Sequence, residues 1–208
     1  AVVKPASTNE VAGVLRAAAD MAVDPAGVRT GLCGGAVALA NGPVSIVLSL
    51  ERLNRIRDVD AQDFSIVAEA GCVVQAVQQA ATDAGRLFPI QWGAQGTAQI
   101  GGMLGTNAGG IRTLRWGNAR ELVLGLEVVL PDGRVLDDLR RVRKNNSGYA
   151  LRHLFIGAEG TLGVITAAAL RLAPQLNHVE TAFIAVPGPD AALALYSRMM
   201  EAGADLVA

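Results

Sequence analysis

Cysteine, histidine and aromatic residues are scarce in this sequence of 208 residues. It has two cysteines and two histidines, and aromatic residues make up 4% of it. Cys33 and Cys72 lie far apart in the chain, which argues against a disulfide framework and against a zinc site. His153 and His178 form no ligand pattern with nearby carboxylates, so we expect no metal ion. The low cysteine content favours a reducing compartment, and we expect the protein in the cytoplasm.

An excess of charge of one sign and long hydrophobic runs are lacking as well. The formal net charge is −1 and the 18 basic residues are scattered, which disfavours nucleic-acid binding. No run of 18 apolar residues predicts a membrane span, and no basic start followed by an apolar core predicts a signal peptide. The G-x-S-x-G motif of serine hydrolases is absent. A hydrophobic content of 51% still allows a substantial core, in one large domain or two small ones.

Glycine is abundant and is concentrated in two clusters. Residues 93–110 read GAQGTAQIGGMLGTNAGG, with seven glycines, and residues 25–35 read PAGVRTGLCGG, with four. Because glycine has no Cβ, backbone N–H groups can approach a ligand closely at such positions. The two clusters predict one elongated ligand that carries phosphate and is held by main-chain amides, with Thr30, Thr106 and Asn107 able to orient it.

Tight turns are the alternative explanation of these clusters. It is stronger for the first cluster than for the second, because long, glycine-dense loops are usually functional. The G-x-G-x-x-G motif between a strand and a helix is missing, and so is the phosphate loop G-x-x-x-x-G-K-[ST]. A nucleotide would therefore be bound without either of these two motifs.

The hydrophobic pattern predicts an α+β fold, because helices and strands do not alternate regularly. Ser7 and Glu10 have the spacing of a helix capping box, and Gly85 stands where a second helix would end. Helices are predicted at 8–21, 73–84 and 191–202. Strands are predicted at 1–5, 44–50, 53–59, 65–70, 122–130, 134–136, 163–172 and 179–186, and residues 93–110 are predicted to be a loop without regular structure.

Six short motifs occur in a fixed order between residues 2 and 174. They are TGLCGG (30–35), IGG (100–102), TNAGG (106–110), GLEVVL followed by DG (125–133), KNNSGY (144–149) and GAEGTLGVIT (157–166). Together they resemble the FAD-linked oxidases with a vanillyl-alcohol-oxidase-type (PCMH-type) flavin domain. The resemblance is closest to the FAD-dependent D-2-hydroxyacid dehydrogenases, which act on D-lactate, glycolate or D-2-hydroxyglutarate.

The resemblance implies an FAD-binding domain over residues 1–175. It would consist of two α+β subdomains, about 1–52 and 53–175, with FAD between them, and residues 176–208 would begin a C-terminal substrate domain. The first glycine loop would bind the pyrophosphate, the second would run beside the ribityl chain and the isoalloxazine, and residues 160–165 would close over the adenine-ribose side. The implied cofactor-binding residues are Pro25, Gly27, Val28, Arg29, Thr30, Gly31, Gly34, Gly35, Gly93, Ala94, Gly96, Thr97, Gly101, Gly102, Thr106, Asn107, Gly109, Gly110, Glu159, Gly160, Gly163, Val164 and Ile165.

The first loop departs from the family's usual P-x-G-G-x-T-G pattern. Val28 stands at the second glycine, and Arg29 replaces a small polar residue. A β-branched valine at positive φ would be strained, so either the loop takes another path or FAD affinity is reduced. Arg29 could instead pair with a phosphate. Cys33 is expected to be a small buried filler and Trp92 to belong to the core, and with no histidine in the loop we expect non-covalent FAD.

The implied activity is the oxidation of a D-2-hydroxy acid to the 2-keto acid, with a hydride passing to flavin N5 and electrons moving on to a carrier protein or quinone. The catalytic base and any metal ligands are expected beyond Ala208, so this chain would be an incomplete catalyst, and a homodimer is possible. Two alternatives stay open: a non-catalytic FAD-binding module that needs another chain, and a flavin reductase of a nucleotide sugar. Lys144, Asn146 and Tyr149 would either reach the flavin or form a turn, and Arg112 and Arg115 would meet a substrate carboxylate or be solvated.

Overall fold

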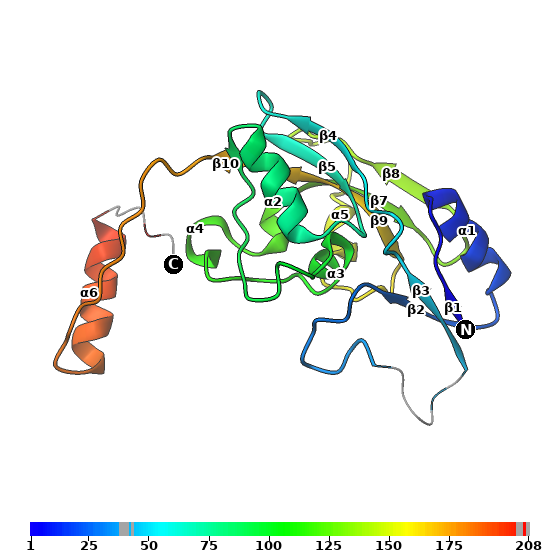
Figure 1. Ribbon diagram of the computed structural model, residues 1–208, viewed down its shortest axis with the longest axis horizontal. Coiled ribbons are helices and arrows are strands. Elements are labelled where there is room, and N and C mark those ends of the chain that lie inside the picture. The colour runs from blue at the N-terminus through cyan, green and yellow to red at the C-terminus, as the bar shows by residue number, and fades with distance from the viewer. Residues whose placement is uncertain (38–41, 43, 203–205, 207–208) are drawn as a thin grey trace.

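The computed structural model describes residues 1–37, 42, 44–202 and 206, and its two main sheets differ in strand direction (Figure 1). The smaller sheet is parallel, with strand order β1-β3-β2. The larger sheet is antiparallel, with strand order β4-β5-β9-β7-β8. Because the two sheets and their helices do not alternate regularly, the predicted α+β class is confirmed.

The parallel sheet comes from the first 49 residues. It contains β1 (Val2–Val3), β2 (Ala22–Ala26) and β3 (Ser45–Ser49), and α1 (Thr8–Ala17) connects β1 to β2. β2 occupies the beginning of the first glycine cluster, where we had predicted a loop. Pro25 is tolerated there because β2 is an edge strand, so its missing N–H faces no neighbouring strand.

The antiparallel sheet carries most of the core. Its strands are β4 (Ile56–Asp60), β5 (Ser65–Glu69), β7 (Val123–Val129), β8 (Val135–Asp138) and β9 (Val164–Arg171). The central strand β9 is buried along nearly its whole length, which suits its run of small and β-branched side chains. Gly125 in β7 is required by close packing, because a Cβ there would lie 2.2 Å from the Asp138 carbonyl oxygen.

The remaining elements are short or lie over the antiparallel sheet. α2 (Val74–Asp83) and α3 (Ile100–Gly105) pack against it, and their buried side chains share one core cluster with β5, β7 and β9. β6 (Arg86–Leu87) pairs with β10 (Ala173–Pro174). Three single-turn elements follow the second glycine cluster: α4 (Thr113–Trp116), the 3₁₀ helix η1 (Ala119–Leu122) and α5 (Arg152–Phe155).

The predicted helix ends are partly confirmed. Ser7 caps α1, its hydroxyl accepting a hydrogen bond from the Glu10 amide at 3.2 Å, whereas the Glu10 carboxylate accepts from Ala6 rather than from Ser7. The helix ends at Ala17, four residues earlier than predicted, because the chain must turn into β2. Gly85 follows α2 at φ +68°, in the left-handed conformation expected of a residue that ends a helix.

Two other predictions are wrong, and one strand is confirmed with a later start. Residues 100–105 form α3 inside the second glycine cluster, where we had expected irregular structure. The strand predicted from residue 53 begins at Ile56. Residues 179–186 form no strand, because no described strand lies beside them to supply hydrogen bonds, and Phe183 there is fully exposed.

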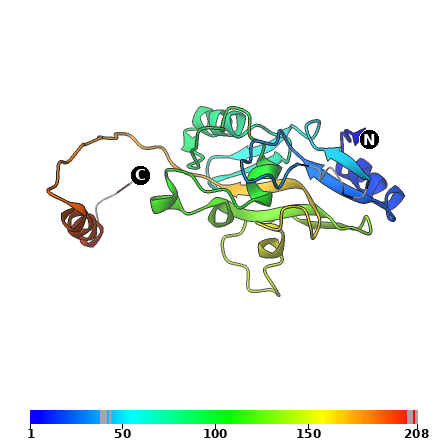
Figure 2. The same ribbon diagram turned by 90° about the horizontal axis from the view of Figure 1, so that it is seen from below.

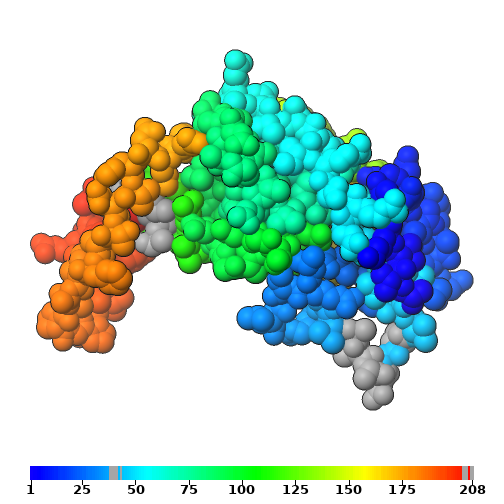
Figure 3. Space-filling model, viewed as in Figure 1, coloured from blue at the N-terminus to red at the C-terminus, as the bar shows by residue number. Residues whose placement is uncertain are grey.

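The last helix, α6 (Pro189–Glu201), stands apart from the rest of the described chain (Figures 1 and 2). It has no buried residue, and an extended segment joins it to the main body, as the space-filling view also shows (Figure 3). The proposed boundary near residue 175 therefore coincides with a change in packing, although the division into domains itself stays a prediction. Of the helices within the described residues, none has the length and apolarity to cross a bilayer.

Arg57 connects two buried carboxylates on one face of the antiparallel sheet. Its guanidinium lies 3.0 Å from Glu127 Oε1 and 3.1 Å from Glu69 Oε1. Glu127 also accepts hydrogen bonds from Thr166 at 2.7 Å and from Thr8 at 2.6 Å. Because Thr8 is the first residue of α1, this cluster attaches α1 and the parallel sheet to the antiparallel sheet.

The electrostatics of this cluster depend on the balance between burial and pairing. Burial alone would raise the pKa of Glu127 and of Glu69, but hydrogen bonds and charge from arginine outweigh it, so both pKa values are lowered. A carboxyl whose pKa is lower in the folded than in the unfolded state stabilises the fold above its unfolded pKa. That contribution disappears as the pH falls through the folded pKa.

Replacing Arg57 with methionine should lower the free energy of unfolding near neutral pH by about 3 kcal/mol, because buried Glu127 loses its cation and Glu69 keeps only Arg55. The difference from the wild type should shrink as the pH falls from about 6 to about 4, because the unpaired Glu127 carboxylate of the variant takes up a proton in this range, whereas the wild-type carboxyls have lowered pKa values and protonate only below 4.5. Urea unfolding across this range measures both effects.

The matched control is Arg134→Met, which removes an arginine paired with Asp132 on the surface. Its side chain is 77% exposed, so the loss should stay below about 0.5 kcal/mol. An equal loss for Arg57→Met at pH 4 and pH 7 would show that Arg57 acts through packing rather than charge.

Candidate functional site

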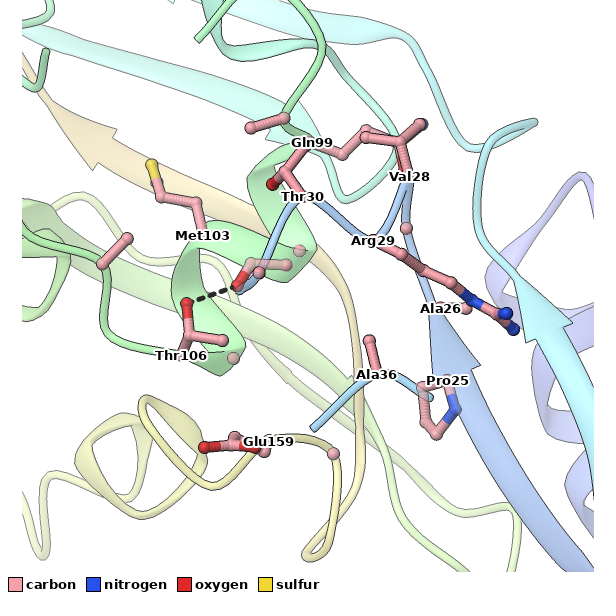
Figure 4. Close-up of a pocket in the computed structure, with 18 of the residues that line it drawn as sticks. Pro25, Ala26, Val28, Arg29, Thr30, Ala36, Gln99, Met103, Thr106 and Glu159 are labelled. Carbon is pink, nitrogen blue, oxygen red and sulfur yellow. Dashed lines mark hydrogen bonds between the residues drawn. The ribbon is translucent and has the colours of Figure 1, made fainter. Parts of the chain in front are cut away.

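A cavity of about 470 Å³ lies where the two glycine clusters meet (Figure 4). Its walls come from the end of β2 and the loop after it, from α3, and from the turn between α5 and β9. Fifteen of the predicted cofactor-binding residues line it: Pro25, Gly27, Val28, Arg29, Thr30, Gly31, Gly35, Gly101, Gly102, Thr106, Glu159, Gly160, Gly163, Val164 and Ile165. Segments 130 residues apart in the sequence thus form one binding surface.

The first loop presents backbone donors that have no partner among the described residues. Within the described part of the chain, no amide between Gly27 and Ala36 donates a backbone hydrogen bond. Glycines at 27, 31, 34 and 35 keep this backbone accessible, because no side chains shield it. A run of free amides of this kind suits an anionic group such as a diphosphate.

The structure shows which residue of the altered loop carries the unusual backbone. Arg29, not Val28, has a positive φ of 56°. The strain predicted for Val28 is therefore absent, and the loop places a residue without β-branching in the left-handed region instead. The Arg29 side chain is directed away from Met103 and Thr106 of α3 (Figure 4), so the structure does not show it reaching into the cavity.

Two adjacent glycines of α3 have different roles. Gly101 packs against Ala70, whose Cβ would lie 2.8 Å from a Cβ at residue 101. Gly102 has no atom within 4 Å of the position that its Cβ would take, although it lines the cavity. Its carbonyl accepts a hydrogen bond from the Thr106 hydroxyl at 3.0 Å (Figure 4). Gly101 is therefore required by packing, whereas Gly102 leaves space for a ligand.

The turn before β9 closes the cavity on the side of β2. Glu159 and Gly160 have positive φ values of 52° and 79°. A Cβ at Gly160 would lie 3.0 Å from Pro25, and a Cβ at Gly35 would lie 2.9 Å from the Glu159 carboxylate. The first loop and this turn are thus packed closely together, and the positive φ of Gly160 favours glycine at that position.

Eight predicted residues lie outside the cavity lining: Gly34, Gly93, Ala94, Gly96, Thr97, Asn107, Gly109 and Gly110. Two of them have clear structural roles. The Asn107 side chain accepts a hydrogen bond from the Arg120 amide at 3.0 Å, and a Cβ at Gly110 would lie 2.2 Å from the Gln91 carbonyl oxygen. Contact of these eight residues with a cofactor stays a prediction.

Several cavity residues were missed or misjudged from the sequence. Cys33 lines the cavity and is exposed, so its expected role as a buried filler is wrong. Trp92 packs against the core, as expected, but also lines the cavity. The others are Ala26, Ala36, Leu50, Ala98, Gln99, Met103, Gly105 and Ala108. All but Ala36 and Leu50 lie within the two glycine clusters, but the sequence did not separate them from neighbouring residues that do not line the cavity.

The polar residues considered for substrate contacts lie elsewhere. Lys144, Asn146 and Tyr149 are exposed and do not line the cavity. Arg112 and Arg115 flank the ring of Trp116, with guanidinium carbons 5.9 and 5.0 Å from its centroid. Among the described residues there is no group of three His, Cys, Asp or Glu side chains that could hold a metal ion.

The family described as FAD binding domain matches residues 1–138, more than half of the chain. The chain belongs to this family. The match includes β2, the first loop and α3, which form two walls of the cavity. The turn that completes the cavity follows the matched region.

The curated relatives of this FAD-binding chain include three from distant organisms. It is 45% identical over 199 residues to D-2-hydroxyglutarate dehydrogenase of Xanthomonas citri pv. viticola, covering 95% of this chain and 42% of that protein. It is 43% identical to mitochondrial D-2-hydroxyglutarate dehydrogenase of Bos taurus, covering 90% and 34%. It is also 43% identical to D-lactate dehydrogenase of Archaeoglobus fulgidus, covering 90% and 41%.

The chain therefore spans about two fifths or less of the length of these relatives. Among solved structures, alkyldihydroxyacetonephosphate synthase matches with a TM-score of 0.73 over 83% of this chain and 31% of that one. At 22% sequence identity, this match shows the shared fold alone. Because the Bos taurus relative is mitochondrial, the cytoplasmic location stays a prediction.

Replacing Gly102 with leucine should fill the cavity without disturbing its walls. The helix should gain about 0.5–1 kcal/mol, because glycine is a poor helix residue. FAD affinity should fall at least about tenfold, since the new side chain occupies the ligand's space. Urea unfolding of the apoprotein and titration with FAD measure the two effects.

Gly13→Leu is the matched control, because Gly13 also lies within a helix and has no atom within 4 Å of its Cβ position. It should stabilise the apoprotein similarly and leave FAD affinity unchanged. Unchanged affinity in the Gly102 variant would show that the ligand does not use this part of the cavity.

Proposed function

We propose that this chain is the FAD-binding part of a dehydrogenase that oxidises D-2-hydroxy acids. The observation that carries the proposal is the cavity itself, which brings fifteen of the predicted cofactor-binding residues together in a chain that is 45% identical to a D-2-hydroxyglutarate dehydrogenase. D-2-hydroxyglutarate and D-lactate are the substrate candidates, because relatives named for them match this chain almost equally well.

The residues present fit FAD in three respects. The amides of residues 27–36, which donate to no other described backbone group, suit the negative charge of a diphosphate. Gly102 leaves room against α3 for a flat or extended group. Apolar side chains such as Leu50, Met103 and Ile165 supply the surface on which a flavin ring packs.

FAD, when bound, supplies the capacity to accept two electrons from the hydroxy acid. The part of the reaction that this chain performs is to bind, orient and shield the cofactor. We place the residues that hold the substrate and its proton acceptor in the portion of the relatives that the chain does not cover. We further propose that α6 packs against that portion, and that a carrier protein or quinone receives the electrons.

The 208-residue chain should retain FAD through desalting and show the visible absorbance of bound oxidised flavin. In the absence of oxygen, adding a D-2-hydroxy acid to this chain should leave the absorbance unchanged. In a protein extended to the relatives' length, the D acid should bleach the flavin absorbance and the L acid should not. Bleaching of the 208-residue chain itself would place the catalytic groups within it. Failure of both proteins to retain FAD would refute the proposed function.

FAD attachment should be non-covalent, so precipitating the loaded chain with acid should release the flavin into the supernatant. Cys33 makes this test informative, because it is exposed and is the cysteine that lines the cavity. Cys33→Ser is the control and should release flavin to the same extent. Flavin that stays with the wild-type pellet but leaves the variant would instead identify a bond to Cys33.

A further inference from the structure

One polar atom in the cavity wall is buried without a partner. Gln99 is only 6% exposed, and its side-chain oxygen Oε1 is among three buried side-chain polar atoms of the described residues that make no hydrogen bond. The other two, Ser65 Oγ and Arg152 Nε, belong to residues that do not line the cavity. Buried acceptors without partners are rare and destabilising, so this one requires an explanation.

The backbone holds Gln99 firmly in place. It forms an isolated β-bridge with Val73, and its carbonyl accepts a hydrogen bond from the Met103 amide at 2.9 Å as α3 begins. Its Oε1 lies 2.9 Å from the position that a Cβ at Gly27 would take. The side chain is therefore packed against the start of the first loop, near Val28 and Thr30 (Figure 4).

The chemical groups around Gln99 Oε1 decide which hydrogen-bond partner fits there. The neighbouring loop offers backbone donors, which suit phosphate oxygens, and its side-chain donors on Arg29 and Thr30 make no hydrogen bond to Gln99 Oε1. A phosphate cannot satisfy Gln99 Oε1, because its oxygens and Oε1 are all acceptors at neutral pH. The missing partner of Oε1 must therefore be a hydrogen-bond donor. It must also lie next to a group, such as a phosphate, that accepts hydrogen bonds from the amides of the loop. In FAD the diphosphate is flanked by hydroxyl groups on both sides, on the ribityl chain and on the adenosine ribose.

We propose that Gln99 Oε1 accepts a hydrogen bond from a hydroxyl group of FAD next to the diphosphate, and so sets how far along the cavity the cofactor lies. The proposal rests on the proposed binding of FAD. Gln99 would then be a cofactor-positioning residue of the second glycine cluster, although it is not one of the residues that the family resemblance implies for FAD binding.

The test is Gln99→Met in the 208-residue chain, since methionine has a similar length and no carbonyl acceptor. FAD affinity should fall about fivefold to tenfold, the range expected for one lost hydrogen bond. The melting temperature of the apoprotein should stay the same or rise, because an unpaired buried acceptor has been removed. A residue that only supports the fold would show the opposite, a lower melting temperature with little change in affinity.

Fragments of the cofactor identify the arm that is contacted. Weaker binding of FMN with unchanged binding of ADP would place the hydroxyl on the ribityl chain, and the reverse would place it on the adenosine ribose. Either result supports the proposal. Equal affinity of the wild type and the variant for FAD, FMN and ADP would overturn it.

Gln78→Met is the matched control. Gln78 is a partly buried glutamine of α2 whose Nε2 donates to the Ile90 carbonyl at 2.6 Å, and it does not line the cavity. This variant should lower the melting temperature and leave FAD affinity unchanged. If the wild type binds no FAD, the proposed function fails and this proposal fails with it, whereas binding by the wild type and an equally tight Gln99 variant refutes this proposal alone.

Discussion

The position of the first glycine loop depends on a charge cluster that lies outside the cavity. Arg57 pairs with Glu127 and, together with Arg55, with Glu69 on the antiparallel sheet, and Glu127 in turn accepts a hydrogen bond from the hydroxyl of Thr8. Thr8 begins the helix that leads into β2, and β2 leads into the loop. A polar network with several hydrogen bonds fixes one relative arrangement of two sheets more strictly than apolar packing alone does. The geometry of the cavity therefore depends on ion pairs of Arg57 with residues that do not line the cavity.

The cavity wall combines two kinds of glycine. At Gly101 neighbouring atoms leave no room for a Cβ, and at Gly160 a Cβ would be tight against Pro25 and the backbone has a positive φ, so these glycines let two segments of the chain pack together. At Gly31 and Gly102, nothing lies within 4 Å of the Cβ position, so these glycines leave space for a ligand. Both kinds are needed, because a cavity for an extended cofactor requires close walls and an open interior.

Much of the fold could be predicted from the sequence, because its strands and helices carry clear local patterns. The strands at 65–70, 122–130 and 163–172 and the helix at 73–84 were found within a few residues of their observed ends. The pattern at 179–186 was just as favourable, yet a strand also needs a partner, and sequence periodicity does not supply one. β2 was missed because Pro25 and Asp24 are poor strand residues that an edge position tolerates.

The site was predictable where backbone accessibility requires glycine, and much less so elsewhere. Leu50, Met103 and Trp92 resemble ordinary core residues in the sequence, and only their position around the cavity distinguishes them. Gln99 lies in the second glycine cluster but was not distinguished within it, because its unusual feature is an unsatisfied atom in a folded environment. The backbone conformation of Arg29 was likewise not predictable. The sequence indicated an altered loop but not which of its residues takes the positive φ.

The extended segment between β10 and α6 has a consequence for limited proteolysis of the protein. It runs from Gln175 to Gly188 with almost every residue exposed, and it contributes no strand to either sheet. Exposed, extended backbone is the form that proteases cleave most readily. A single cut there would release α6 while leaving both sheets and the cavity whole, so limited digestion offers a direct route to a compact flavin-binding core.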